Sequence, residues 1–356
     1  MSDVVFLKIK KHEVGEVQRI VHKAMDVGEY KKYIHGPKIF VKINGISDQL
    51  VPGQCSSPWV VDGVLSKLRQ DFPDAEIYMG DANLAAAEQL NRASQIWGHR
   101  DLAKKYNVTF VNLSEQPTVE VDVGGKIFKK LPLPKILVDV DTILNVPVAK
   151  THCLTDITCT LKNHWGMVPR FRHQYHLVAD QCIADINFYF KKTAFNVVDG
   201  TIMMEGNAPR TGIPRVEDVI IAGADRVAID YTVAKYMGFD ADKVGHIARA
   251  EEMGVGSRKN IRLIGDVNDF KIQNFKKPEP DKQPIFFWEM HLRKVPVVKQ
   301  IIFDTPIFRI FSEIATLYNT KVWYNIHGKK YTKQILETSW YRAEFEDLVK
   351  RESEIK

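Results

Sequence analysis

The feature that most constrains the fold is the alternation of apolar strands with amphipathic helices between Val4 and Gly265. Short apolar runs bounded by turn residues predict strands, and apolar residues spaced three and four apart predict helices. We predict strands at 4–9, 39–43, 76–79, 108–113, 143–148, 195–198, 219–222 and 261–264, and helices at 13–27, 57–71, 85–105, 154–165, 177–190 and 226–237. This order predicts an α/β fold with a mostly parallel, doubly wound sheet and helices on both faces.

Two parts of the chain depart from this alternation of strands and helices. Residues 118–131 form two alternating runs around Gly124 and Gly125, which predicts a β-hairpin excursion. We divide the chain into an α/β core domain (1–266), a linker rich in proline and charge (267–284), and an aromatic, basic, mainly helical C-terminal extension (285–356). An apolar stripe in the extension predicts a helix packed on the core domain, with a dimer arm or an active-site lid as alternatives. A membrane-surface helix ranks behind these, because the polar face of the stripe is not strongly cationic. The stripe comprises Phe303, Ile307, Ile310, Phe311, Ile314 and Leu317.

Composition excludes several classes of protein. The net charge of +6 is spread without long blocks of like charge, so nucleic acid is not an expected partner. No apolar run approaches the ~20 residues of a membrane span. The four cysteines form no C-x-x-C pair, which argues against an intrinsic iron–sulfur cluster, and free thiols favour a cytoplasmic location. The usual glycine-rich nucleotide motifs, G-x-S-x-G and H-E-x-x-H are also absent.

Polar residues gather where the predicted strands end. Because ligands of open parallel sheets bind outside the carboxyl ends of the strands, we expect one crevice there. Lysines suit carboxylate or phosphate oxygens, and a histidine suits acid–base work. The predicted helix 154–165 would add stripes of threonine, lysine and asparagine to this crevice. The candidate catalytic residues are Lys150, His152 and Lys162; the candidate substrate-binding residues are Lys42, Asn44, Thr151, Thr155, Thr158, Asn163 and Gly206.

Three carboxylates near the same strand ends could hold a divalent metal. Asp199, Glu205 and Asp225 would supply the oxygen ligands that a hard cation such as magnesium prefers. Asp199 and Asp225 have an alternative interpretation, since each could cap the helix that follows it.

Several longer segments resemble a known family. They are 42–68 (KINGISDQLVPGQCSSPWVVDGVLSKL), 77–83 (IYMGDAN), 145–169 (NVPVAKTHCLTDITCTLKNHWGMVP), 176–186, 197–212 and 219–239. Together they resemble the uncharacterised DUF362 family over roughly residues 4–265. Many relatives carry a fused ferredoxin-like module rich in cysteine, and this chain has none. The resemblance implies matches to the family pattern but assigns no role; the matching positions are Lys42, Asn44, Asp81, Lys150, Thr151, His152, Thr155, Lys162, Asn163, Asp199, Glu205, Gly206 and Asp225.

Three functions fit these observations. The first is an enzyme acting on a small anionic metabolite by racemisation, elimination or group transfer, with a divalent metal such as magnesium as a candidate cofactor. The second is an oxidoreductase or cofactor-assembly protein that works with a separate iron–sulfur partner. In that case the extension would dock the redox partner. Alternatively, the extension would form the contact of a homodimer. The third is a binding protein without catalysis.

Overall fold

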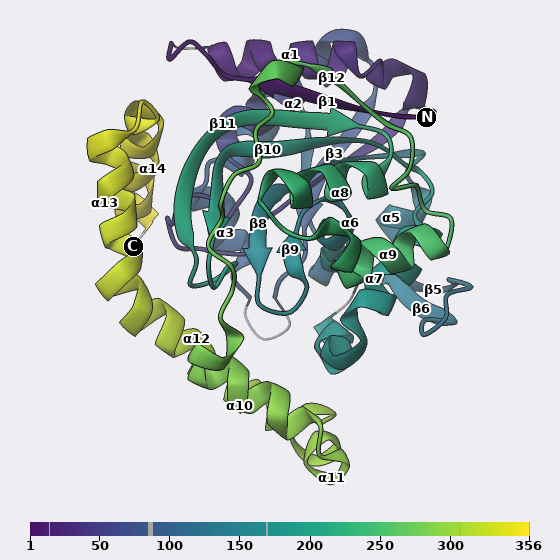
Figure 1. Ribbon diagram of the computed structural model, residues 1–356, viewed down its shortest axis with the longest axis vertical. Helices are drawn as coiled ribbons and strands as arrows, with labels where there is room; N and C mark the ends of the chain where they lie inside the picture. The colour runs from purple at the N-terminus through teal and green to yellow at the C-terminus, as the bar shows by residue number, and fades with distance from the viewer. Residues whose placement is uncertain (14, 85–87, 169, 306, 356) are drawn as a thin grey trace.

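A ten-stranded sheet forms the centre of the molecule. The computed structural model describes residues 1–355 apart from 14, 85–87, 169 and 306 (Figure 1). The main path of the sheet runs β12–β1–β11–β10–β7–β2–β3–β4, and β8 and β9 branch from β10. The strands are β1 Ser2–Lys8, β2 Lys38–Ile43, β3 Glu76–Asp81, β4 Thr109–Asn112, β7 Thr142–Val146, β8 Val148–His152, β9 Asp156–Thr158, β10 Thr193–Glu205, β11 Ile213–Gly223 and β12 Ile261–Gly265. The predicted α/β class is confirmed, since β10, β7, β2, β3 and β4 are successive parallel neighbours.

Helices cover both faces of the sheet. Alternate residues of one strand enter different cores: Val4 and Phe6 pack with one apolar cluster, whereas Val5 and Leu7 pack with the other. The first face is covered by α5 Lys135–Asp139, α6 Thr160–Asn163, α7 Ala179–Tyr189, α8 Arg226–Tyr236 and α9 Gly245–Glu252, and the second by α1 Glu16–Val27, α2 Pro58–Asp71, α3 Leu90–Ile96 and α4 His99–Lys105.

Most of the predicted helices and strands are present near their expected bounds. The predicted helix 85–105 is two helices, because Gly98 between α3 and α4 adopts a left-handed φ of 70°. Residues 85–87, where that helix was expected to begin, lie outside the described part of the chain. The β-hairpin excursion is confirmed as β5 Thr118–Asp122 paired with β6 Lys130–Pro134.

The helix predicted at 154–165 is wrong. After Pro147 the chain forms a second strand, β8, then turns and returns as β9, which pairs antiparallel with it. Only then does the short helix α6 begin, at Thr160. The segment is rich in threonine, whose branched side chain favours an extended backbone, and this outweighed the accidental helical spacing of its apolar residues. Lys150 and Thr158 are therefore neighbours across two strands.

The strand predicted at 195–198 is much longer than expected. β10 continues to Glu205 and forms a long antiparallel hairpin with β11. Because β11 runs against its neighbours, its carboxyl end lies at the opposite edge of the sheet from the ends of β2 and β7. Asp225, which follows β11, is consequently placed away from the residues that follow β2 and β7.

The C-terminal extension curves along the outside of the molecule as a series of helical segments (Figure 1). These are α10 Pro284–Arg293, α11 Pro296–Val298, η8 Lys299–Phe303, α12 Ile307–Leu317, η9 Tyr318–Gly328, α13 Lys329–Thr338 and α14 Arg342–Ile355. Its last two helices join the second core through Ile335, Tyr341, Phe345 and Leu348. Within the described chain, none of the helices is long and apolar enough to cross a bilayer.

The stripe predicted in the extension is not buried as expected. Phe303 is buried, but Ile307, Ile310, Ile314 and Leu317 are exposed to solvent. The side chain of Phe311 lies outside the described residues. Instead, α12 turns Phe308, Ser312, Ala315 and Thr316 toward a cavity over the core domain. The dimer arm and the active-site lid stay predictions.

Candidate active site

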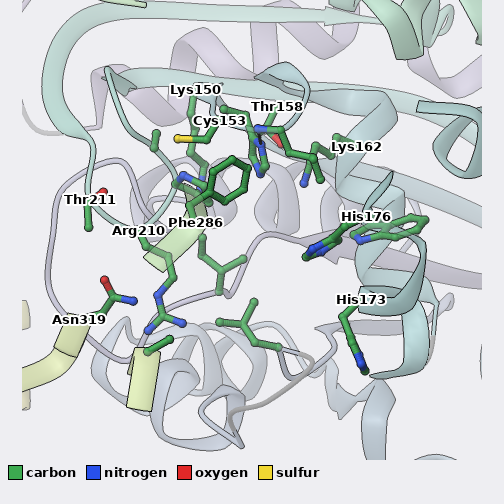
Figure 2. A pocket seen from close by; sticks show the side chains of 18 of the residues that line it. Lys150, Cys153, Thr158, Lys162, His173, His176, Arg210, Thr211, Phe286 and Asn319 are labelled. Carbon is green, nitrogen blue, oxygen red and sulfur yellow. Dashed lines mark hydrogen bonds between the residues drawn. The ribbon is translucent and has the colours of Figure 1, made fainter. Parts of the chain in front are cut away.

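A cavity of about 620 Å³ lies between the branch strands β8 and β9, the helical turns η3 His164–Met167 and η4 Arg170–Val178, and the extension (Figure 2). Its basic lining residues are Lys42, Lys150, Lys162, Arg172, Arg210 and Lys282, and its acidic ones are Asp81 and Glu289. The lining therefore has six basic side chains and two acidic ones, which gives the cavity an excess of positive charge. Seven of the predicted site residues line it: Lys42, Asn44, Lys150, His152, Thr158, Lys162 and Asn163.

The strand geometry of β8 decides which side chains face the cavity. Residues two apart on a strand share a face, so Lys150 and His152 point the same way, and Thr158 lies opposite Lys150 on β9. Thr151 points to the other side, where its hydroxyl donates to the Gly206 carbonyl at 2.7 Å. The predicted binding residues Thr151, Thr155 and Gly206 therefore do not line the cavity; they hold the backbone behind it.

The two cavity lysines have different surroundings. Lys150 is fully buried and its ammonium donates to Asn44 Oδ1 at 2.9 Å and to the Gln54 carbonyl. Burial lowers the pKa of Lys150 to about 8. Burial and the neighbouring charges of Arg172 and Lys150 lower the pKa of Lys162 to about 7. The Lys162 ammonium has no hydrogen bond or ion pair to any described residue, so it is free to meet a ligand.

His152 is held as a neutral imidazole. Its Nδ1 accepts a hydrogen bond from the Leu154 backbone N–H at 3.0 Å, which places the ring proton on Nε2. Burial, followed by the charge of Lys162, lowers the pKa of His152 well below its usual range. Nε2 makes no hydrogen bond within the described chain. The ring is thus positioned to donate one proton into the cavity.

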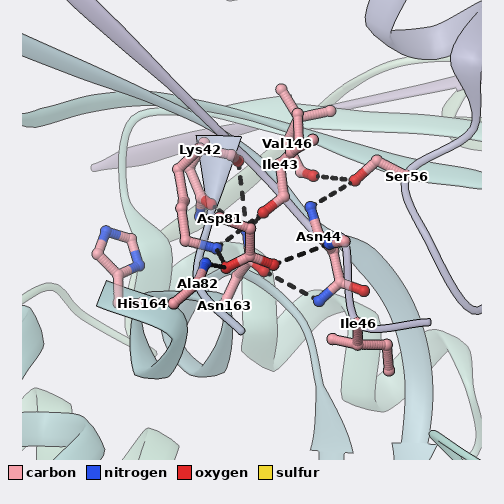
Figure 3. A network of polar contacts seen from close by, with 12 residues as sticks. Lys42, Ile43, Asn44, Ile46, Ser56, Asp81, Ala82, Val146, Asn163 and His164 are labelled. Carbon is pink, nitrogen blue, oxygen red and sulfur yellow. Dashed lines mark hydrogen bonds and ion pairs between the residues drawn. The ribbon is translucent and has the colours of Figure 1, made fainter. Parts of the chain in front are cut away.

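Behind the cavity lies a buried polar network (Figure 3). Lys42 forms an ion pair with Asp81 at 2.6 Å, and both side chains are almost completely buried. Asn44 Nδ2 donates to Asn163 Oδ1 at 3.2 Å, and Asn163 Nδ2 donates to Asn145 Oδ1 at 2.7 Å. Since Asn44 also accepts from Lys150, the amides fix the position of that lysine from behind.

Two arginines of the cavity were not predicted. Arg172 is buried and donates to the carbonyls of Val168 and Asn83 at 2.8 and 2.7 Å. Arg210 also lines the cavity, as does Asn319 of the extension (Figure 2). Burial lowers the pKa of Arg210, and its guanidinium has no partner among the described residues. Neither arginine has a sequence spacing that relates it to Lys150. The one signal for Arg210 was its place in the family-like segment 197–212, within a loop that contains asparagine and proline.

The extension closes the cavity through contacts with two histidines, His173 and His176. The His173 ring stacks on Phe308 of α12, with centroids 3.9 Å apart. His176 Nδ1 lies 3.4 Å from Glu289 of α10. Burial tends to raise the pKa of Glu289, but His176 and Arg293 outweigh it and lower that pKa to about 2. Glu289 is therefore an anion whose charge is already balanced by Arg293, which donates to it at 2.8 Å.

Cys153 also faces the cavity, next to Asn207 and Gln283. Burial raises the pKa of its thiol to about 11, so the thiol form dominates near neutrality.

The three carboxylates predicted to bind magnesium do not meet. Asp199 lies within β10, where it accepts from the Ser57 N–H at 2.7 Å and from the Thr201 hydroxyl at 2.6 Å. Glu205 pairs with Arg215 at 3.2 Å, and Asp225 caps α8 through the Ala228 N–H at 3.0 Å. The long β10–β11 hairpin separates them. No group of three or more histidine, cysteine, aspartate or glutamate side chains in the described residues is arranged to hold a metal.

The sheet, its helical layers and the cavity at the strand ends define an α/β protein with a basic cavity beside its sheet. The chain belongs to the DUF362 family, a domain of unknown function, whose model matches residues 39–235. It is 26% identical over 296 residues to "Thylakoid-associated protein sll1697" of Synechocystis sp., an alignment that covers 78% of this chain and 88% of that protein. The matched family range holds Lys42, Lys150, His152, Lys162 and Arg210, whereas the extension lies outside it.

Among solved structures, the chain is similar to the lactate racemase apoprotein from Thermoanaerobacterium thermosaccharolyticum. The TM-score is 0.43 with 13% sequence identity, over 71% of this chain and 57% of that chain. The chain thus spans little more than half of that structure, and our assignment of the fold rests on the sheet topology described above.

Proposed function

We propose that this protein is an enzyme that binds an anionic metabolite in the cavity and moves a proton on it. The observation that carries the proposal is the charge of the lining: six basic groups face two acidic ones, and Lys162 and Arg210 have no partner in the described chain. Unpaired cations removed from bulk water are costly unless a ligand supplies the opposite charge. An anion is therefore the missing partner.

The groups facing the anion support proton transfer. An amine with a pKa of about 7 is partly neutral at physiological pH, so Lys162 can accept a proton, and Lys150, with a pKa of about 8, can return one. Arg210 and Arg172 would orient a carboxylate or phosphate, and the neutral His152 would donate from Nε2. This arrangement favours racemisation or elimination beside an acidic group over group transfer.

The size of the cavity suggests a ligand larger than a simple acid. A volume of about 620 Å³ is in the range of sites for drug-sized molecules, and Phe286, Phe308 and Trp323 contribute apolar surface. We infer an anion that also carries an apolar portion. We do not include magnesium, since Asp199, Glu205 and Asp225 are engaged elsewhere. Four free thiols support a cytoplasmic location for this reaction.

Calorimetry with a panel of carboxylates and phosphate monoesters of increasing chain length tests the binding step. Lys162→Met should lower the affinity of the best ligand roughly ten-fold to a hundred-fold, the worth of a charge-assisted hydrogen bond. The matched control is Lys104→Met on the exposed surface of α4, which removes the same charge outside the cavity. Equal affinities for wild type and Lys162→Met would refute the proposed site.

Hydrogen exchange separates an enzyme from a binding protein. In deuterated water, wild type should introduce deuterium next to the acidic group of a bound ligand, detected by proton NMR. His152→Gln should bind with little change in affinity but exchange much more slowly. Binding without any exchange in wild type would instead indicate a non-catalytic binding protein.

A further inference from the structure

The outer surface of the extension exposes an unusual amount of apolar side chain. Of the twenty-one large hydrophobic residues that are exposed in the described chain, eleven lie between Trp288 and Ile326. Soluble surfaces normally scatter such residues singly, and a contiguous patch marks a contact site for protein or lipid. The concentration in so short a segment therefore requires an explanation.

These residues form a line along α12 and η9, which we call the outer strip. On α12, Ile307, Ile310, Ile314 and Leu317 share one face at a spacing of three and four residues, with 43%, 59%, 57% and 57% of each residue exposed. The π-helical turns of η9 continue the line with Val322 and Ile326, and Tyr318 lies at its edge, where it also lines the cavity. The opposite face of α12 covers the cavity through Phe308, Ser312 and Thr316. One side of this helix therefore faces the cavity, and the other side is exposed to solvent.

Charge selects the partner of the outer strip. Between residues 284 and 330 the sequence has seven lysines and arginines but three aspartates and glutamates. Lys321, Lys329 and Lys330 are exposed beside or just beyond the strip. Aliphatic residues on one face with lysines at the border and a tyrosine along the edge are the pattern of helices that lie in the interface of an anionic membrane. A protein interface would be expected to offer more hydrogen-bonding groups among these side chains.

We propose that the outer strip docks on an anionic lipid surface, with the helix axis parallel to the membrane plane and the apolar side chains inserted among the headgroups. This contact does not span the membrane, and it does not depend on the proposed chemistry of the cavity. It places the roof of the cavity at the lipid boundary. A ligand with an apolar portion could then reach the site from the membrane.

Vesicle co-sedimentation of the full-length protein tests the proposal. Wild type should pellet with vesicles of phosphatidylcholine and phosphatidylglycerol, less with phosphatidylcholine alone, and less again at high salt. Ile310→Ser combined with Ile314→Ser should lower the partition coefficient at least ten-fold without changing the thermal midpoint, since both residues are exposed. Ile272→Ser is the matched control, because Ile272 is 71% exposed on a different segment.

Two outcomes overturn the proposal. One is wild-type protein that stays in the supernatant with anionic vesicles. The other is a dimer, seen by light scattering, that the double serine variant abolishes while vesicle binding is absent; the strip would then be a contact between two copies. Lys162→Met should bind vesicles as wild type does, so the result is independent of whether the cavity binds an anion.

Discussion

Lys162 illustrates how a single residue acquires chemistry from its surroundings. Lys162 lies in the first turn of α6, and Asp230 fixes the start of that helix. The Asp230 carboxylate accepts hydrogen bonds from the backbone N–H groups of Thr160 and Leu161 at 2.8 and 3.0 Å. The rigid turn holds the lysine in the cavity near Lys150 and Arg172, whose charges, together with burial, depress its pKa. A half-buried ammonium without a counter-ion costs folding free energy, as expected of a group kept for binding rather than for stability.

This cost makes the stability of the ligand-free protein depend on pH. The pKa of Lys162 is about 7 in the folded state and near 10.5 when unfolded. The unfolded chain therefore binds more protons between these values, so the penalty is complete below about pH 7 and disappears as the pH rises toward 10.5. Lys162→Met should raise the free energy of unfolding by about 1–4 kcal/mol below neutrality, and the gain should shrink in alkaline solution.

Urea unfolding of wild type and Lys162→Met across this pH range measures the effect. Lys104→Met, which removes an exposed lysine, should leave the free energy of unfolding unchanged at each pH. A difference between wild type and Lys162→Met that stays constant with pH would mean that Lys162 keeps its ordinary pKa.

At the scale of elements, the two hairpins β8–β9 and β10–β11 position the site jointly. The β8–β9 hairpin presents Lys150 and His152, and its reverse side is fastened to the loop after β10 by the bond from Thr151 to Gly206. The same loop holds the linker, because the Gly206 N–H donates to the Lys276 carbonyl at 2.7 Å. A change in this loop is therefore transmitted to the cavity wall.

Gly206 and Gly254 form a matched pair for testing this coupling. Both have left-handed backbone, with φ of 71° and 73°, and neither has an atom close enough to clash with an added Cβ. Alanine at either position should cost about 1–2 kcal/mol of stability from backbone strain alone. Only Gly206→Ala should also weaken ligand binding, because only Gly206 supports Thr151. Equal ligand affinity of the two variants would argue against a role of this loop in placing His152.

At the scale of the whole molecule, the extension both roofs the cavity and completes the core. Helix α14 buries Phe345 and Leu348 against the second face of the sheet, and the turn between α13 and α14 buries Tyr341 there. Trp340 Nε1 and the Tyr341 hydroxyl donate to Asp218 of β11 at 3.1 and 3.0 Å. The chain beyond the linker is thus bound at its far end as well as over the cavity.

A chain that ends at Asp281 should therefore aggregate, because the core surface beneath α13 and α14 would be uncovered. Size-exclusion chromatography beside the full-length protein provides the measurement. In the full-length chain, Tyr341→Ala should lower the free energy of unfolding by about 3–5 kcal/mol, whereas Tyr318→Ala on the outer strip should change it by less than about 0.5 kcal/mol. A truncated chain with unchanged elution and thermal midpoint would contradict this view of the extension.

The sequence by itself determined the class of fold and much of the candidate site. Continuous apolar runs such as 219–222 identify buried strands because the local pattern reflects burial directly. The expectation that strand ends gather polar residues brought Lys42, Asn44, Lys150 and His152 together without any structure, since parallel strands end at one edge of a sheet. These inferences depend on residues close in sequence or on a rule of topology that holds for every parallel strand.

Only the tertiary structure decided the remainder. Residues 154–165 have a helical spacing of apolar residues as well as threonines that favour a strand, and pairing with β8 decided in favour of the strand at Asp156–Thr158. The antiparallel direction of β11 moved Asp225 to the far edge, which no local pattern encodes. Arg172, Arg210 and the roof of α12 reach the cavity from distant segments. Their convergence depends on how the chain crosses over the sheet. The sequence alone does not show which distant segments come into contact.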